Sequence, residues 1–99
     1  MPRKPGEPRR NCYGYIVLLE RPDGTKGFYV GQSALPPEDR FARHRAGIQS
    51  SVAVRKYGQH LLPELYDRDN PMTRAEAEAW ERATAERLRR QGCWVEGGH

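Results

Sequence analysis

The segment CYGYIVLLE at residues 12–20 constrains the fold more than any other part of the chain. It is rich in aromatic and β-branched side chains, which favour a β-strand. Alternate side chains of a strand point to opposite faces of the sheet. One face would then hold Tyr13, Tyr15, Val17 and Leu19, and the other would hold Gly14, Ile16 and Leu18. Because both faces are apolar towards the end of the segment, we expect a central strand that is covered on two sides.

The length and composition of the chain predict one domain that is not embedded in a membrane. Its 99 residues suffice for a single modest core, and 36% hydrophobic with 30% charged residues suits such a domain. No apolar run approaches the roughly 20 residues of a membrane-spanning helix, and no apolar signal core follows the basic start MPRKPGEPRR. We expect a cytoplasmic protein with a disordered basic arm at residues 1–11 and a folded domain at residues 12–99.

The remaining segments predict an α+β domain. The turn RPDGTKG leads to a second strand at Gly27–Gly31, a helix begins at Pro36 and Pro37 and ends at Gly47, and residues 51–58 form a short helix or turn. A third strand is expected at residues 60–67, where Pro63 favours a sheet edge. The expected architecture is a three-stranded antiparallel sheet flanked by helices, with Trp94 and Val95 folding back as a lid.

The last helix contains an acidic residue on its apolar side. Thr73 and Glu76 predict a capping box at its start, and Gly92 predicts its end. Its apolar stripe is formed by Ala77, Trp80, Thr84 and Leu88. Glu81 falls in the middle of this stripe. A buried carboxylate is unfavourable unless it is paired or holds a metal ion, so Glu81 either does one of these or reaches water at the margin of the stripe.

The positive charge is unevenly distributed. The net charge is +4, and residues 1–10 account for +3 of it, with four basic residues against Glu7. Downstream, no acidic residue lies between Asp39 and Glu64, and this interval contains five basic residues. These are Arg40, Arg43, Arg45, Arg55 and Lys56. Such a stretch is either a solvated surface or a contact for the phosphates of nucleic acid.

The two cysteines, Cys12 and Cys93, are too few for a disulfide scaffold. A zinc site would need both of them and two of His44, His60 and His99, without the close ligand spacing of known zinc motifs. We therefore expect two ordinary thiols.

Two short motifs and three later residues give the chain a resemblance to the GIY-YIG endonuclease superfamily. The first motif is Tyr13-Gly14-Tyr15-Ile16, with Tyr15 at the position of the GIY tyrosine, and the second is Phe28-Tyr29-Val30-Gly31, with Tyr29 at the first position of YIG. The family's helix arginine, followed four residues later by His or Tyr, matches Arg40 and His44. Its glutamate on the last helix, four residues after an alanine, matches Glu81 after Ala77.

This resemblance implies an endonuclease that hydrolyses phosphodiester bonds of nucleic acid, with DNA as the expected substrate. It places Tyr15, Tyr29, Arg40, His44 and Glu81 in the catalytic site. Glu81 would bind Mg²⁺, with Mn²⁺ as a substitute, and Arg40 would hold a phosphate oxygen. We expect Tyr15 to activate the water and Tyr29 to hydrogen-bond the water or the phosphate. His44 would relay a proton or contact phosphate, unless it is simply a histidine on the helix surface.

The expected contacts to nucleic acid outside the catalytic residues are Arg43, Arg45, Arg55, Lys56 and Gln32. The protein would act as a monomer or as a transient dimer on its substrate. Two alternatives stay open: a catalytically weak module that binds nucleic acid in the same groove, which Gln32 favours, and a protein-interaction domain in which the tyrosines are core residues.

Overall fold

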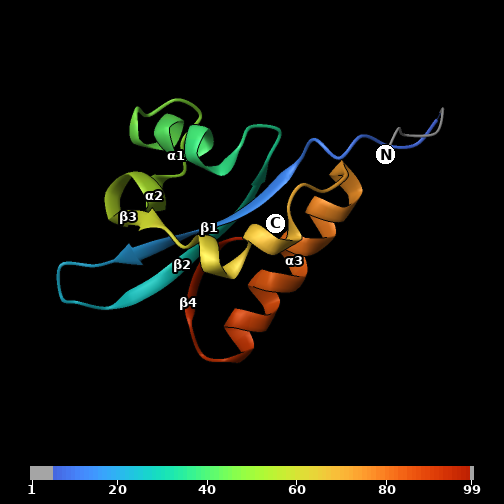
Figure 1. Cartoon of the computed structure of the whole chain (residues 1–99). Helices are drawn as coiled ribbons and strands as arrows, with labels where there is room; N and C mark the ends of the chain where they lie inside the picture. Colours follow the sequence, from blue (N-terminus) through green and yellow to red (C-terminus); the bar gives the residue numbers. More distant parts are fainter. Residues whose placement is uncertain (1–5, 99) are drawn as a thin grey trace.

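The computed structural model describes residues 6–98, which form one sheet with helices on both faces (Figure 1). The elements follow in the order β1 (Tyr13–Glu20), β2 (Lys26–Ser33), α1 (Pro37–Arg45), α2 (Val52–Tyr57), β3 (Gly58–Leu61), the short 3-10 helices η1 (Pro63–Leu65) and η2 (Asp67–Asp69), α3 (Arg74–Arg90) and β4 (Trp94–Gly97). The domain is therefore α+β, as expected from the sequence.

The sheet has four strands in the order β3-β1-β2-β4. Strand β1 lies between β2 and β3 and is antiparallel to both, so the prediction of a central strand is confirmed. The fourth strand, β4, runs parallel to β2 and pairs Gly27–Val30 with Trp94–Gly97. The predicted three-stranded antiparallel sheet is therefore wrong. Trp94 and Val95 do fold back and pack against the core, as expected, but they do so as part of a fourth strand. This strand covers the outer edge of β2, whose backbone N–H and C=O groups need partners.

Helices cover opposite faces of the sheet. Tyr15 of β1 bonds to His44 of α1, whereas a Cβ placed on its neighbour Gly14 would lie 2.4 Å from the ring of Trp80 in α3. Because neighbouring residues of a strand face opposite ways, α1 and α3 lie on different sides of the sheet (Figure 1). The main core lies around the centre of β1, where Ile16, Val17 and Leu19 are fully buried.

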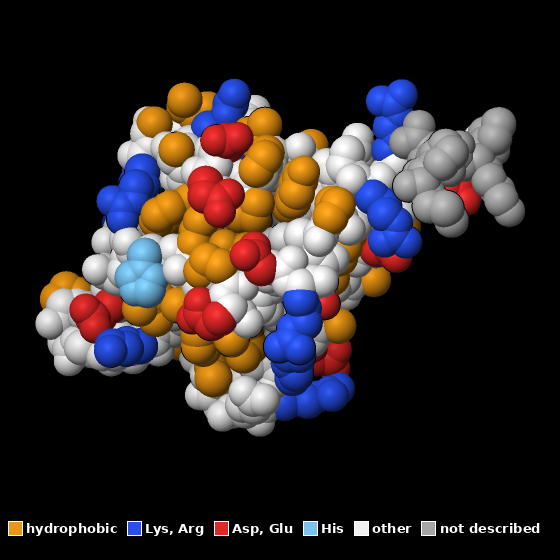
Figure 2. Space-filling model, viewed as in Figure 1, with side chains coloured by type: hydrophobic (Ala, Val, Ile, Leu, Met, Phe, Trp, Pro, Cys, Tyr) orange, Lys and Arg blue, Asp and Glu red, His pale blue; other side chains and the backbone are white. Residues whose placement is uncertain are grey.

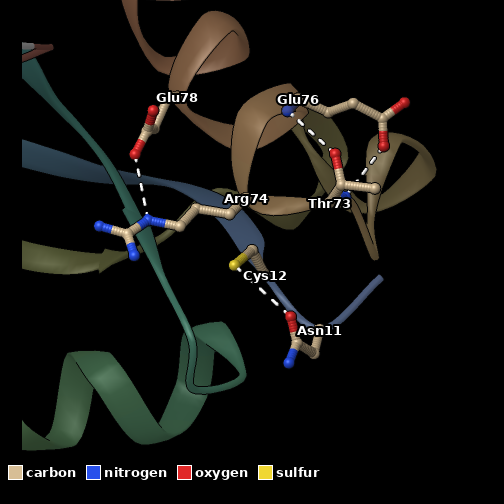
Figure 3. A network of polar contacts seen from close by, with 6 residues as sticks. All are labelled: Asn11, Cys12, Thr73, Arg74, Glu76 and Glu78. Atoms are coloured by element: carbon tan, nitrogen blue, oxygen red, sulfur yellow. Dashed lines mark hydrogen bonds and ion pairs between the residues drawn. The ribbon is translucent and has the colours of Figure 1, made fainter. Parts of the chain in front are cut away.

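The start of α3 is anchored beside the start of β1 (Figure 3). The hydroxyl of Thr73 accepts a hydrogen bond from the N–H of Glu76 at 3.1 Å, and the Glu76 carboxylate accepts one from the N–H of Thr73 at 2.9 Å. This is the predicted capping box. Next to it, Cys12 and Met72 exchange two backbone hydrogen bonds of 2.9 and 2.8 Å. These bonds fix where α3 begins relative to the sheet.

The end of α3 directs the chain back onto the sheet. Gly92 has a φ of 84°, a left-handed conformation that is easy for glycine, and it terminates the helix as predicted. Strand β4 then begins at Trp94, whose ring packs over Gly27 of β2. A Cβ on Gly27 would lie 2.5 Å from that ring, so this residue must be glycine for the two strands to pair in their observed register.

The third strand is shorter and earlier than predicted. It spans Gly58–Leu61 instead of residues 60–67, and Pro63 begins the 3-10 helix η1. A proline has no N–H for a sheet ladder, which ends the strand before it. The predicted edge position is confirmed, because β3 is the outer strand next to β1.

Part of the predicted arm lies outside the described residues, namely residues 1–5. Residues 7–11 are exposed and belong to no helix or strand, and Arg10 lies 3.5 Å from the carboxylate of Glu76. None of the helices in residues 6–98 has the length and apolar character to cross a membrane.

We predict that Gly14→Ala lowers the free energy of unfolding by about 1–3 kcal/mol, because the new methyl group would overlap the Trp80 ring. Urea denaturation of the variant measures this loss. The same substitution in a Trp80→Leu background should cost clearly less, since the smaller side chain makes room. Equal losses in both backgrounds would show that the ring does not impose the constraint.

Candidate active site

The register of the β1–β2 hairpin brings both motif tyrosines to one face of the sheet. Tyr15 lies opposite Gly31, and Tyr29 lies opposite Val17. Paired residues share a face, so the two phenol rings are diagonal neighbours, with ring centroids 6.0 Å apart. The sequence could not provide this register, which decides whether the two hydroxyls can act together.

Gly31 makes room for the Tyr15 ring. A Cβ on Gly31 would lie 2.6 Å from the hydroxyl oxygen of Tyr15. No real Cβ tolerates such a distance, so glycine at this position lets the ring lie flat across β2. Gly31 of the second motif is therefore needed for Tyr15 of the first motif to pack in this position.

His44 is buried and uses both of its ring nitrogens. Its side chain has an exposed fraction of 0%, and it projects from the last turn of α1 towards the two phenols. Nε2 lies 2.9 Å from the Tyr15 hydroxyl, and Nδ1 accepts a hydrogen bond from the backbone N–H of Ser51 at 3.0 Å. The interpretation of His44 as a surface histidine is wrong, because the loop at 46–51 closes over it.

These contacts determine which nitrogen of neutral His44 carries the proton. A backbone N–H can only donate, so Nδ1 has no proton and Nε2 carries it. Burial, with a smaller contribution from the Arg40 guanidinium, lowers the pKa of His44 to about 4, so the imidazole is neutral at pH 7. Nε2–H therefore donates to the Tyr15 oxygen.

The two phenols are not equivalent. Burial raises the pKa of both Tyr15 and Tyr29, and the increase for Tyr15 is large. Interaction with Tyr29 raises the pKa of Tyr15 further, whereas interaction with Tyr15 lowers the pKa of Tyr29. The Tyr15 oxygen accepts from His44, so the Tyr15 proton is free to bond elsewhere. A hydrogen bond from the Ser51 side chain also lowers the pKa of Tyr29.

The charges of Arg40 and Glu81 have opposite effects on this pair. The positive charge of Arg40, on α1, lowers the pKa of both phenols, and the negative charge of Glu81, on α3, raises it. Arg40 is half-buried and donates to the backbone carbonyls of Ile48 and Gln49 at 3.4 and 2.7 Å. These bonds hold the guanidinium in place and leave other N–H groups for a ligand.

Glu81 is half-buried beside three buried positions of α3, namely Ala77, Thr84 and Leu88. The structure thus brings all five predicted catalytic residues into one electrostatic neighbourhood: Tyr15, Tyr29, Arg40, His44 and Glu81.

The predicted contacts to nucleic acid are not gathered as closely. Arg43 and Arg55 are exposed. Arg45 donates to the carbonyl of Gln59 at 2.6 Å, and its guanidinium lies 4.7 Å from the centre of the Phe41 ring. Arg45 therefore ties α1 to β3.

Lys56 and Gln32 lie on different sides of the sheet. Lys56 is exposed on α2 and, together with Tyr29, lines an open depression of about 450 Å³. Gln32 follows Gly31 in β2, so its side chain points away from the phenols, towards a smaller depression of about 300 Å³ that it shares with Cys12 and Arg74.

Ser51 is the residue that sequence reasoning missed. It caps α2 by accepting from the N–H of Val54 at 3.4 Å, donates its own N–H to His44, and hydrogen-bonds Tyr29. A serine directly before a helical segment is a signal for a helix cap. That signal identifies the cap but says nothing about the histidine and tyrosine that meet there.

A metal ion at this site would rely on few protein ligands. Among residues 6–98, no three His, Cys, Asp or Glu side chains form a group that could hold a metal ion. Cys12 and Cys93 are free thiols, as predicted, and they pack in two different hydrophobic clusters.

Comparison with protein-family models, with curated proteins and with solved structures gave no match to this chain. The functional interpretation therefore depends on the residues and geometry described above.

We predict that the depressed pKa of His44 makes stability depend on pH. In the unfolded chain His44 binds a proton near pH 6.5, whereas the folded state resists protonation until about pH 4. The free energy of unfolding should therefore fall as the pH falls from about 6.5 to about 4, by up to roughly 3 kcal/mol. Urea denaturation at several pH values measures this loss.

The matched variants are His44→Gln and His60→Gln. Glutamine at position 44 can still accept from Ser51 and donate to Tyr15, but it does not titrate, so the stability loss above pH 5 should largely disappear. His60 is exposed, and His60→Gln should keep the wild-type profile. Identical profiles for His44→Gln and wild type would contradict the prediction.

Proposed function

We propose that the protein is a metal-dependent endonuclease that hydrolyses phosphodiester bonds in nucleic acid, most readily DNA, by the GIY-YIG type of reaction. The observation that carries the proposal is the meeting of Tyr15, Tyr29 and His44. The Tyr15 hydroxyl bonds to Nε2 of His44 at 2.9 Å, the Tyr29 ring lies 6.0 Å from the Tyr15 ring and 5.5 Å from the His44 ring, and the charges of Arg40 and Glu81 act on both phenols. Burying two phenols and an imidazole costs more than an apolar core does unless their polar atoms are hydrogen-bonded. Networks of this kind are typical of catalytic sites.

The environments of the two phenols favour Tyr29 as the base, in place of the Tyr15 expected from the sequence. Burial raises the pKa of both, but Tyr15 is the more strongly desolvated of the two, since its exposed fraction is 1% and Tyr29 is half-buried. Interactions with Tyr15 and Ser51 lower the pKa of Tyr29, which favours its phenolate. His44 then acts as a positioning residue that orients the Tyr15 hydroxyl.

Glu81 is the residue that would hold the metal ion. A single half-buried carboxylate fits Mg²⁺, because this ion usually keeps several waters and takes one or two carboxylates together with phosphate oxygens. When bound, the ion supplies positive charge that stabilises the charge developing on the phosphate and on the leaving oxygen.

The protein residues carry out the remaining steps. Tyr29 takes a proton from a water molecule, whose oxygen bonds to phosphorus while the bond from phosphorus to the leaving sugar oxygen breaks. Arg40 holds a non-bridging phosphate oxygen through N–H groups that its two backbone carbonyls do not use. The leaving oxygen takes a proton from solvent, and Tyr29 returns its proton to solvent.

Cleavage assays test the proposal directly. Supercoiled plasmid and end-labelled oligonucleotides of several shapes are incubated with the full chain and Mg²⁺, Mn²⁺ or EDTA. Cleavage that EDTA abolishes supports the proposal. Salt-sensitive retention of DNA without cleavage would instead support the catalytically weak binding module. Gln32 is weak support for that alternative here, because its side chain points away from the two phenols.

We predict that Tyr29→Phe lowers kcat by a factor on the order of 10²–10⁴, the usual contribution of a general base. Tyr15→Phe should lower kcat less, by about tenfold, because it removes only a hydrogen-bond donor to the phenolate. The rate of the wild type should rise with pH, since the reactive form of Tyr29 is deprotonated. This rising limb should persist in Tyr15→Phe at higher pH and vanish in Tyr29→Phe. The opposite pattern would assign the base to Tyr15.

We predict that Glu81→Gln lowers the Mg²⁺-dependent rate by a factor on the order of 10³ while the fold persists. Glu78→Gln is the matched control. It removes an acid one turn earlier on α3, where Glu78 lies 3.2 Å from Arg74, and it should cleave at the wild-type rate. Full activity of Glu81→Gln, measured by plasmid nicking, would rule out Glu81 as the metal ligand.

A further inference from the structure

An open depression adjoins the candidate active site and has no role in the steps above. Its volume is about 450 Å³, and α2 and the end of β4 contribute most of its lining. The lining residues are Tyr29, Ser51, Val52, Ala53, Lys56, Tyr57, Glu96 and Gly97. Because Tyr29 and Ser51 belong to the active site as well, a group in this depression would lie directly beside the bond that is cut.

The charges of the depression suit a base better than a phosphate. Lys56 lies on one wall and Glu96 on the other. A carboxylate repels a phosphate, but it accepts hydrogen bonds from the exocyclic amino group of a base, as aspartate and glutamate do with cytosine N4. One oxygen of Glu96 accepts from the indole N–H of Trp94 at 3.2 Å, which orients the carboxylate and leaves acceptor sites for a ligand.

The walls also offer aromatic surface. Tyr57 lines the depression, and its ring meets the ring of Trp94 edge-on with centroids 5.7 Å apart. The Arg21 guanidinium lies 3.7 Å from the centre of the Trp94 ring. Aromatic side chains of this kind stack on unpaired bases with little dependence on sequence.

The size of the depression limits its occupant. Its volume of about 450 Å³ lies within the range of about 300–1,000 Å³ that is usual for small-ligand sites, and it is enough for one nucleotide. A base that is stacked and paired inside a duplex is not free to enter such a site. A protein that binds duplex DNA usually has a broad positively charged surface, and the face drawn in Figure 2 has none. There, acidic side chains lie among hydrophobic ones, and most Lys and Arg side chains lie near the borders.

We infer that this depression holds one unpaired nucleobase that carries an exocyclic amino group, and that Glu96 selects it. The inference deepens the proposed function and rests on it. It assigns as substrate class a nucleic acid with an unstacked nucleotide beside the cut, such as a single strand, a flap or a bulge. Lys56 binds the phosphate that follows this base, and Tyr57 supports its ring.

Binding of short single strands tests this site without depending on cleavage. Fluorescence anisotropy with labelled hexamers of deoxycytidine and of thymidine, in EDTA at pH 7.5 and fixed salt, gives two values of Kd for the full chain. The wild type should bind the cytidine hexamer about tenfold more tightly, since thymine offers a carbonyl where cytosine offers an amino group. A hexamer with abasic sites should bind about tenfold more weakly than the cytidine hexamer.

Two variants with the same change in net charge separate base selection from general electrostatics. In Glu96→Gln the amide can still accept from Trp94, but it can also donate to thymine, so the cytidine preference should shrink to less than about twofold. Glu86→Gln removes an exposed acid of α3 and should keep the tenfold preference.

The outcomes for this site and for the nuclease are distinguishable. Equal Kd values for the two hexamers with the wild type, no measurable binding of either, or an unchanged preference in Glu96→Gln would overturn the base site, whatever the cleavage assays show. A cytidine preference that Glu96→Gln removes, in a protein that cuts no substrate with Mg²⁺ or Mn²⁺, would establish the base site and overturn only the proposed nuclease activity.

Discussion

The arrangement of the candidate site depends on one buried hydrogen bond, between the Tyr15 hydroxyl and Nε2 of His44. It joins the central strand β1 to the end of α1, and the second nitrogen of His44 joins both to the N–H of Ser51 at the start of α2. Each of these groups is desolvated, so breaking one bond leaves a buried polar atom without a partner. The sheet, the two helices and the loop at 46–51 are therefore held in one arrangement by two polar side chains and one backbone N–H group.

The same bond makes two chemically identical phenols different. The backbone N–H of Ser51 determines the tautomer of His44, and the tautomer makes the Tyr15 oxygen an acceptor. A backbone group at the start of a short helix thus determines how the Tyr15 hydroxyl is bonded, whereas Tyr29 has no contact of this kind with His44 beyond the packing of the two rings.

Charges of opposite sign act on this network. Arg40 is on α1 and Glu81 is on α3, and their effects on the pKa of both tyrosines have opposite signs. Elsewhere, burial raises the pKa of Tyr66, and the negative charges of Glu38, Asp67 and Glu64 raise it further. Acidic groups of this kind repel a phosphate backbone. Nucleic acid would therefore approach where Lys56 and Arg40 lie, beside Tyr29.

Local rules were enough to predict much of the fold. The capping box at Thr73, the end of α3 at Gly92 and the central position of β1 follow from short sequence patterns, because caps, turns and strand alternation involve neighbours in the chain. The five candidate catalytic residues were also found in the sequence, through spacing and the resemblance it carries. Only the tertiary structure decided the fourth strand, because the edge of β2 that Trp94–Gly97 pairs with lies more than 60 residues away in the chain. The tertiary structure also decided that Tyr15 and Tyr29 share a face, because this depends on the register of the hairpin. It decided the tautomer of His44 as well, because this depends on how the loop before Ser51 closes over the end of α1.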